Sequence, residues 1–169
     1  MKKISIEEKK ERSIEEKKEF LNHFFLYEID MLESMTKYHE KLFHAPVDEQ
    51  FVENIIVETY LLHGRNLLEF FYYDDQQQDK ATANEFLEKG KDWKKLRPPL
   101  TEYLKILQRR VDRETTHLTY KRVVGKPESK FWNFHVLYVD LMMVFCIFAK
   151  NVAEEYADEK FRQFKERIC

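Results

Sequence analysis

An arginine and a histidine seven residues apart are the side chains in this sequence best suited to chemistry. Arg110 and His117 lie in the stretch Gln-Arg-Arg-Val-Asp-Arg-Glu-Thr-Thr-His (108–117). If this stretch is helical, the spacing places them within roughly 20° of each other on one face. A guanidinium binds phosphate oxygens without losing its charge, and an imidazole exchanges protons near neutral pH. The pair predicts phosphodiester chemistry, and the alternative is a solvated histidine at a helix end.

Positive charge is concentrated around this pair. Between Lys89 and Lys126 twelve basic residues stand against four acidic ones, although the whole chain carries −2. Such an asymmetry indicates an anion-binding face. We therefore expect substrate contacts from three nearby side chains, Arg113, Lys121 and Arg122. The alternative is that the basic stretch pairs with acidic helices of the same molecule.

A second polar cluster interrupts an apolar stretch at residues 58–69. It contains Glu58, His63, Arg65, Asn66 and Glu69. On a helix Glu58, Arg65 and Glu69 fall within about 40° of one another, which predicts an arginine held between two carboxylates in a structural network. His63, Arg65 and Asn66 are also candidates for substrate contact. Glycine at position 64 weakens a helix, so it suggests that another backbone or a ligand approaches there.

The spacing of histidines and carboxylates does not favour a metal centre. Carboxylate-bridged dimetal bundles need a Glu-x-x-His pattern on each of two helices, and this chain has one, Glu114 with His117. A mononuclear site built from His63, His117 and His135 stays open as an alternative. We expect neither a metal nor another cofactor.

The elements that would position these side chains are long helices. Only 3 glycines and 4 prolines interrupt the 169 residues, and apolar residues recur at helical spacing. The pattern predicts helices over residues 20–45, 48–73 and 98–124, and a fourth helix from residue 127 onward. The last of these is apolar on nearly every side from 136 to 149, which is typical of the central helix of a bundle. The expected fold is all-α, an antiparallel bundle of four main helices.

The domain organisation follows from the change in composition near residue 20. The sequence Ser-Ile-Glu-Glu-Lys-Lys-Glu occurs at residue 5 and again at residue 13, which predicts a charged helical extension over residues 1–19 with almost no apolar face. Residues 20–169 form the helical bundle domain. Within it we expect a polar loop at 74–83, a short helical turn at 84–89, and an irregular stretch around a buried Trp93.

The two cysteines do not form a disulfide framework. Cys146 lies in an apolar run and is expected to be a buried free thiol. The final segment, 158–169, either continues the fourth helix or turns away. The N-terminus lacks an apolar stretch of signal-peptide length, and residues 134–149 are too short to span a bilayer. We expect a cytoplasmic protein with no membrane contact.

Two phrases of the sequence resemble a known superfamily. Leu-Leu-His-Gly-Arg-Asn-Leu-Leu-Glu-Phe-Phe (61–71), followed by His-Leu-Thr-Tyr-Lys-Arg (117–122), is similar to small bacterial proteins of the HEPN superfamily, whose signature is Arg-x4–6-His. The branch of AbiU-type abortive-infection proteins is one possibility. The resemblance implies a homodimer that cleaves RNA without a metal, with His117 moving the proton and Arg110 stabilising the charged phosphate. The biological roles implied are toxin, phage defence or RNA processing.

Two other classes of function compete with this one. The first is a non-catalytic helical module that binds a protein partner, in which the basic stretch forms ion pairs. The second is a bundle that binds a metal through histidines.

Overall fold

Helices make up most of the chain that the structure, a computed structural model, describes: residues 12–42, 49–73, 80–111 and 133–169. In chain order they are α1 (Ile14–Glu19), the π-helix η1 (Phe20–Phe25), α2 (Leu26–Leu42), α3 (Glu49–Tyr72), the 3-10 helix η2 (Ala83–Phe86), α4 (Trp93–Leu96), α5 (Glu102–Val111), α7 (Phe134–Ala149) and α8 (Glu159–Ile168). The β pairing within these ranges is limited to one isolated bridge, between Leu87 and Val152. The prediction of an all-α fold is confirmed.

The first three helical segments join end to end. The hydroxyl of Ser13 accepts a hydrogen bond from the backbone N–H of Glu16 (3.2 Å), while the Glu16 carboxylate accepts one from the Ser13 backbone (2.8 Å). This capping box fixes the start of α1. No side chain of α1 is buried, as expected for the second copy of the charged repeat. Burial begins at Leu21, in η1.

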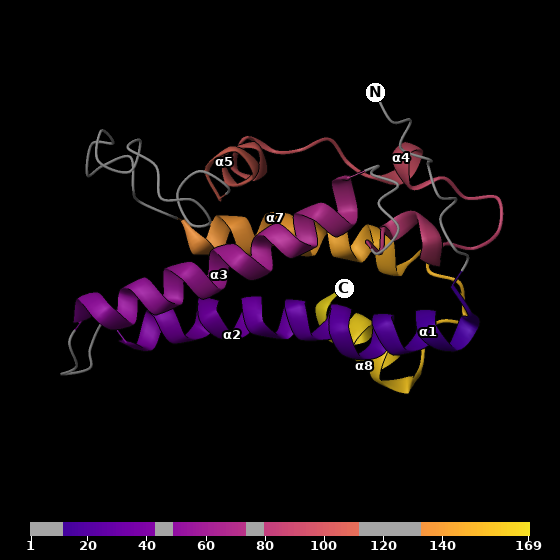
Figure 1. Cartoon of the computed structure of the whole chain (residues 1–169), viewed down its shortest axis with the longest axis horizontal. Coiled ribbons are helices and arrows are strands. Elements are labelled where there is room, and N and C mark those ends of the chain that lie inside the picture. Colours follow the sequence, from indigo (N-terminus) through magenta and orange to yellow (C-terminus); the bar gives the residue numbers. More distant parts are fainter. Residues whose placement is uncertain (1–11, 43–48, 74–79, 112–132) are drawn as a thin grey trace, which may run out of the picture.

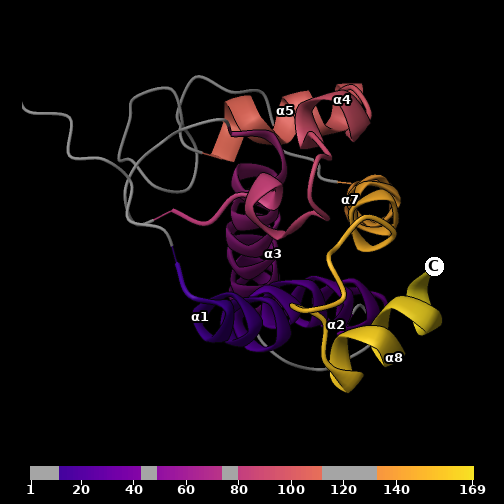
Figure 2. The same ribbon diagram turned by 90° about the vertical axis from the view of Figure 1, so that its right-hand side faces the viewer.

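The long helices α2, α3 and α7 form the body of the molecule. Figure 1 shows that α3 and α7 run in the same direction, opposite to α2. The shorter α5 lies across this layer rather than along it, and α8 packs beside α2 and α7 (Figure 2). α7 contacts α2, α3, α5 and α8, so the most apolar helix packs on several sides, but Val139 and Met143 leave one side exposed. None of the described helices is both long enough and apolar enough to cross a membrane.

Helix α5 begins later than the prolines at 98–99 predict. Thr101 provides the start, because its hydroxyl accepts from the backbone N–H of Leu104 (3.2 Å) and also donates to Asp140 of α7. The expected continuation of this helix beyond residue 111 lies outside the described residues. Leu104, Leu107 and Val111 are buried and hold α5 against the body.

Gly64 marks the point where four helices meet. A β-carbon at this position of α3 would lie 3.2 Å from Leu107 of α5, 3.8 Å from Leu32 of α2 and 3.9 Å from Leu141 of α7. The approaching groups are side chains of three other helices, not the backbone or ligand that the sequence suggested. The absence of a side chain lets the helices pack at this distance.

A buried aromatic cluster forms the other half of the core. The ring of Phe148 in α7 lies 5.5 Å from Phe25 of η1, 5.2 Å from Phe70 of α3 and 5.7 Å from Trp93 of α4, centroid to centroid. All three pairs meet edge to face, which is the favourable orientation for aromatic quadrupoles. Through this one side chain of α7, the cluster joins η1, the end of α3 and α4.

Trp93 and Arg97 close the end of α3. The indole N–H of Trp93 donates to the carbonyl of Phe71 (2.6 Å), and the Arg97 guanidinium donates to the carbonyls of Phe71 (3.2 Å) and Tyr72 (3.0 Å). The last carbonyls of a helix have no partner within the helix, so these two side chains supply one. The expected role of Trp93 as a buried anchor is confirmed.

The fourth predicted helix ends earlier than its sequence indicates. No glycine or proline follows Ala149, yet α7 stops there. The Asn151 side chain donates to the Ile147 carbonyl (2.7 Å), and the next residue, Val152, forms the bridge with Leu87. The bridge to the distant residue Leu87 draws the chain out of the helix, and residues 159–168 turn away as the separate helix α8.

The expectation of a free thiol at position 146 is wrong. Cys146 of α7 and Cys169 form a disulfide with a Cα–Cα distance of 5.4 Å. The Cys146 side chain is half-buried rather than part of the core. α8 returns along α7 and brings the last residue beside the exposed side of that helix. Sequence separation alone gives no sign of this return.

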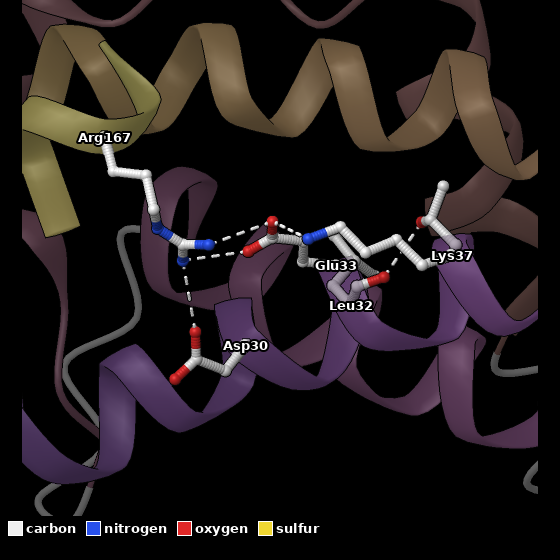
Figure 3. A network of polar contacts seen from close by, with 6 residues as sticks. Asp30, Leu32, Glu33, Lys37 and Arg167 are labelled. Atoms are coloured by element: carbon white, nitrogen blue, oxygen red, sulfur yellow. Dashed lines mark hydrogen bonds and ion pairs between the residues drawn. The ribbon is translucent and has the colours of Figure 1, made fainter.

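Glu33 fastens α8 to α2 from the other side. Its carboxylate, 11% exposed, accepts hydrogen bonds from Lys37 and from Arg167 of α8 (3.1 Å), and Arg167 also approaches Asp30 (3.5 Å) (Figure 3). Burial by itself raises the pKa of Glu33. The hydrogen bonds and positive charges of Lys37 and Arg167 outweigh burial and hold this pKa below its ordinary value.

We predict that Gly64→Val lowers the free energy of unfolding by about 1–3 kcal/mol, because the added methyl groups displace Leu107 in a packed interior. Urea unfolding followed by circular dichroism measures the change. Leu62→Val, at an exposed position of the same helix, controls for β-branching and should change stability by less than about 0.5 kcal/mol. Equal effects of the two substitutions would contradict the close packing at Gly64.

A second prediction concerns acid. Because the folded-state pKa of Glu33 is lowered, its stabilising contribution is complete above the unfolded value of about 4.3 and is lost as pH falls through the lower folded value. Glu33→Gln should therefore cost about 1 kcal/mol at neutral pH and progressively less in that acidic window. Unfolding in urea at several pH values tests this. Glu58→Gln, at an exposed carboxylate, should leave the curve unchanged, and a constant cost at every pH would refute the explanation.

Candidate functional site

Helix α3 carries a histidine that is held by a carboxylate of α2. The Nδ1 atom of His63 lies 2.6 Å from Oε2 of Glu28, and the same oxygen accepts from the Asn66 amide (3.1 Å). The His63 side chain is 7% exposed and that of Glu28 is 24% exposed. The ring of Tyr27 meets the imidazole edge to face at 5.6 Å. Two elements far apart in sequence thus form one polar cluster, Glu28–His63–Asn66.

The geometry fixes which nitrogen of His63 carries the proton. An ionised carboxylate only accepts hydrogen bonds, so Nδ1 must donate to Glu28. In the neutral imidazole Nε2 is then the basic nitrogen, and no hydrogen bond to Nε2 is found within the described ranges. The carboxylate of Glu28 thereby sets the tautomer and the orientation of the imidazole ring.

The predicted network of α3 exists only in part. Arg65 donates to Glu69 through Nε (2.9 Å), and Lys80 donates to the other Glu69 oxygen (3.1 Å). Glu58 is exposed, and in the described part of the chain it makes no hydrogen bond or ion pair. Of the two predicted partners of Arg65, Glu69 is found, and no contact with Glu58 is found among the described residues. One carboxylate lies between two cations instead, because Lys80 reaches Glu69 from the segment after the polar loop.

A groove connects these two clusters along the surface. Its deeper half, about 210 Å³, is lined by the polar side chains of Glu28, Asn66, Glu69 and Lys80. The other half, about 250 Å³, continues past Lys80 toward α1. Both halves share two aromatic side chains, Phe20 and Phe24, and Phe24 is 60% exposed. His63 lies behind the wall that Glu28 and Asn66 form.

The aromatic wall of the groove comes from the π-helix η1. Six residues, Phe20–Phe25, adopt this wider winding between two α-helical segments. A π-helix changes which side chains share a face, and such segments occur frequently at functional sites. In η1 the rings of Phe20 and Phe24 are stacked at 6.5 Å beside the groove. The sequence pattern predicts an ordinary α-helix here, so this feature was missed.

Several candidate residues lie outside the described part of the chain. These are His117, Arg113, Lys121 and Arg122, together with the side chain of Arg110, whose backbone belongs to the last turn of α5. The described portion of the basic stretch pairs mainly with close neighbours: Lys91 with Glu88 (2.7 Å) and Lys105 with Glu102 (2.7 Å). These pairs differ from the expected alternative, in which basic residues meet acidic helices elsewhere in the molecule.

Metal binding finds no support in the described residues. No group of three histidine, cysteine or carboxylate side chains there is arranged to hold an ion. Of the three histidines proposed as alternative ligands, His63 is paired with Glu28, His135 is exposed on α7, and His117 lies outside the described ranges. The groove therefore offers aromatic faces, amide and carboxylate groups, two lysines and an arginine rather than a metal centre.

Comparison with known proteins gives no relative for this chain. No protein-family model, curated protein or solved structure matches it. The function must be argued from the groove, the polar cluster and the sequence motifs.

We predict that His63 is the Nδ1–H tautomer at about pH 9, where imidazoles are ordinarily neutral. Long-range proton–nitrogen NMR distinguishes the two tautomers. Glu28→Gln removes the carboxylate acceptor and should restore a mixture that contains the Nε2–H form. Glu19→Gln changes an exposed carboxylate of the neighbouring segment and should leave the spectrum of His63 unchanged. Nε2–H in the wild type would contradict the assignment.

Proposed function

We propose that the protein binds RNA and cleaves it without a metal ion, with Arg110 and His117 as the catalytic pair. The observation that carries the proposal is the packing of α5 on α3. The phrase at residues 61–71 lies on α3, and α5 crosses α3 at Gly64 with Leu107 in contact. Arg110 is the third residue after Leu107. Helix packing thus supports a site in which the backbone of Arg110 lies near the phrase at 61–71, whereas His117 lies outside the described residues.

The chemistry requires only groups that this chain supplies. The ribose 2′-hydroxyl attacks the adjacent phosphorus while His117 accepts its proton, and the bond from phosphorus to the 5′-oxygen breaks. The proton is returned to that oxygen, which leaves a 2′,3′-cyclic phosphate and a 5′-hydroxyl. Arg110 stabilises the negative charge that develops on the phosphate oxygens.

Substrate binding in this proposal draws on the basic stretch. Arg113, Lys121 and Arg122 bind the RNA backbone, so affinity falls steeply with salt. Asn66 faces the groove and contacts the substrate. His63 and Arg65 are each held by a carboxylate of the protein and position the wall of the groove. The functional unit is a cytoplasmic homodimer, with roles in toxicity, phage defence or RNA processing.

A second candidate is a module that binds a protein partner without catalysis. The exposed aromatic side chains near the groove favour it: Phe24 is 60% exposed and Tyr27 is 53% exposed. Aromatic side chains are enriched at protein interfaces, and large ones are costly to leave in water.

The test is cleavage of mixed-sequence RNA in EDTA at low salt, followed on a denaturing gel. Wild-type protein should cleave, and His117→Ala or Arg110→Ala should reduce the rate by about 100- to 10,000-fold. His135→Ala replaces an exposed histidine of α7 and serves as the matched control, with an unchanged rate.

Each result separates the candidates. Cleavage that survives His117→Ala would remove this histidine from the mechanism. Salt-sensitive retention of RNA without cleavage would leave RNA binding and refute catalysis. Neither cleavage nor retention by the wild type would contradict the proposal and favour the protein-binding module.

A further inference from the structure

Helix α8 is attached to the body at three points, and the first is Asn22. The buried amide of this η1 residue donates to the Tyr156 carbonyl (2.9 Å), and its oxygen accepts from the Asp158 backbone N–H (3.1 Å). Asp158 in turn caps α8, with its carboxylate accepting from the Phe161 N–H (3.0 Å). The start of α8 is therefore fixed by backbone hydrogen bonds that no thiol chemistry affects.

The second attachment is apolar and involves two side chains. Phe161 and Phe164 are buried, and their rings lie 6.2 Å and 5.6 Å from Phe145 of α7. Most of the remaining residues of α8 are exposed. An isolated helix of ten residues is unstable in water, so α8 keeps its form only while these contacts persist.

The third attachment lies at the end of α8 and has two parts. Arg167 pairs with Glu33 and Asp30 of α2, and Cys169 is bonded to Cys146 of α7. The Arg167 side chain is 50% exposed, so solvent weakens its ion pairs. The covalent bond is accordingly the strongest restraint on this end of the helix.

The disulfide is placed where a reductant can reach it. Cys169 is exposed and Cys146 is only half-buried, whereas structural disulfides of small proteins are commonly enclosed by the core. Disulfides in a reducing compartment are usually transient or redox-sensing. Because the bond is accessible and ties only the short helix α8 to α7, it differs from a bond that holds a whole domain together.

We propose that the Cys146–Cys169 bond is a reversible thiol switch that controls the docking of α8. Two equivalents of a thiol such as glutathione reduce it: two electrons and two protons pass to the cysteines, and the thiol becomes its own disulfide. The end of α8 then separates from α7, with Asn22 as the pivot. Release uncovers the aromatic surface of Phe145, Phe161 and Phe164 and leaves the rest of the fold in place. The inference is independent of RNA cleavage but rests on the cytoplasmic location proposed above.

The first experiment measures whether cellular thiol concentrations open the bond. The protein is equilibrated in glutathione buffers that span the ratios of reduced to oxidised thiol found in cytoplasm, and free cysteines are trapped with a polyethylene-glycol maleimide. We expect the trapped fraction to pass through half within this series. A bond that stays closed in the most reducing buffer would overturn the proposal.

The second experiment measures what opening does, by hydrogen–deuterium exchange with mass spectrometry. Amides of residues 159–168 should exchange at least tenfold faster after reduction, while residues 61–71 of α3 keep their protection. Cys169→Ser, at the exposed terminal position, should reproduce the reduced pattern without reductant. The same variant should then show no further response to glutathione, which controls for reductant effects elsewhere.

Two outcomes of this experiment would refute the switch. Unchanged exchange in 159–168 after reduction would mean that the apolar and ionic attachments hold α8 without the disulfide. Loss of protection in residues 61–71 as well would mean that the bond supports the entire fold.

Discussion

The structure depends on one face of α7. Leu141 and Phe148 are seven residues apart, so they lie nearly above one another on that helix. Leu141 reaches the site at Gly64 where α2, α3 and α5 converge, and Phe148 is the centre of the aromatic cluster. Because both packing centres share this face, a shift of α7 would disturb every long helix at once. Because α3 is held at Gly64 and at Phe70, its side chains at the candidate site have a fixed position relative to α7.

The position of the polar cluster follows from this packing. With Gly64 turned toward α5 and α7, its neighbour His63 turns toward α2, where Glu28 and Tyr27 meet it. One turn further along α3, Asn66 reaches the groove. Helix α3 therefore contributes Gly64 to the core and Asn66 to the groove wall. The π-helix η1 matters here because it directs Phe20 and Phe24 to the groove while Phe25 joins the aromatic core.

Periodicity along the chain was enough to predict the helical class and the extent of α3, and the large aromatic side chain of Trp93 was enough to expect its burial in an irregular stretch. It failed where contacts between distant segments decide the outcome. The end of α7 depends on Val152 pairing with Leu87, and the disulfide depends on α8 folding back. Cys146 stands in an apolar run, so its own neighbours predict a core position. The partner of Glu28 could not be inferred either. Glu28 and His63 are 35 residues apart, and the sequence does not show how α2 and α3 are aligned.

The two partly buried polar clusters have different physical explanations. Glu33 joins α2 to α8, and its carboxylate pairs with two cations. Its contribution to holding the fold is therefore enough to explain why a carboxylate stands there. The Glu28–His63 pair joins α2 and α3, which already contact each other extensively. A pair of apolar residues would hold that interface equally well, because desolvation of polar groups offsets most of what their attraction gains. Packing therefore does not explain why a histidine with a free nitrogen stands behind the groove wall. The pair instead fixes one part of the groove wall, because Glu28 and Asn66 line the groove and His63 holds Glu28 from behind.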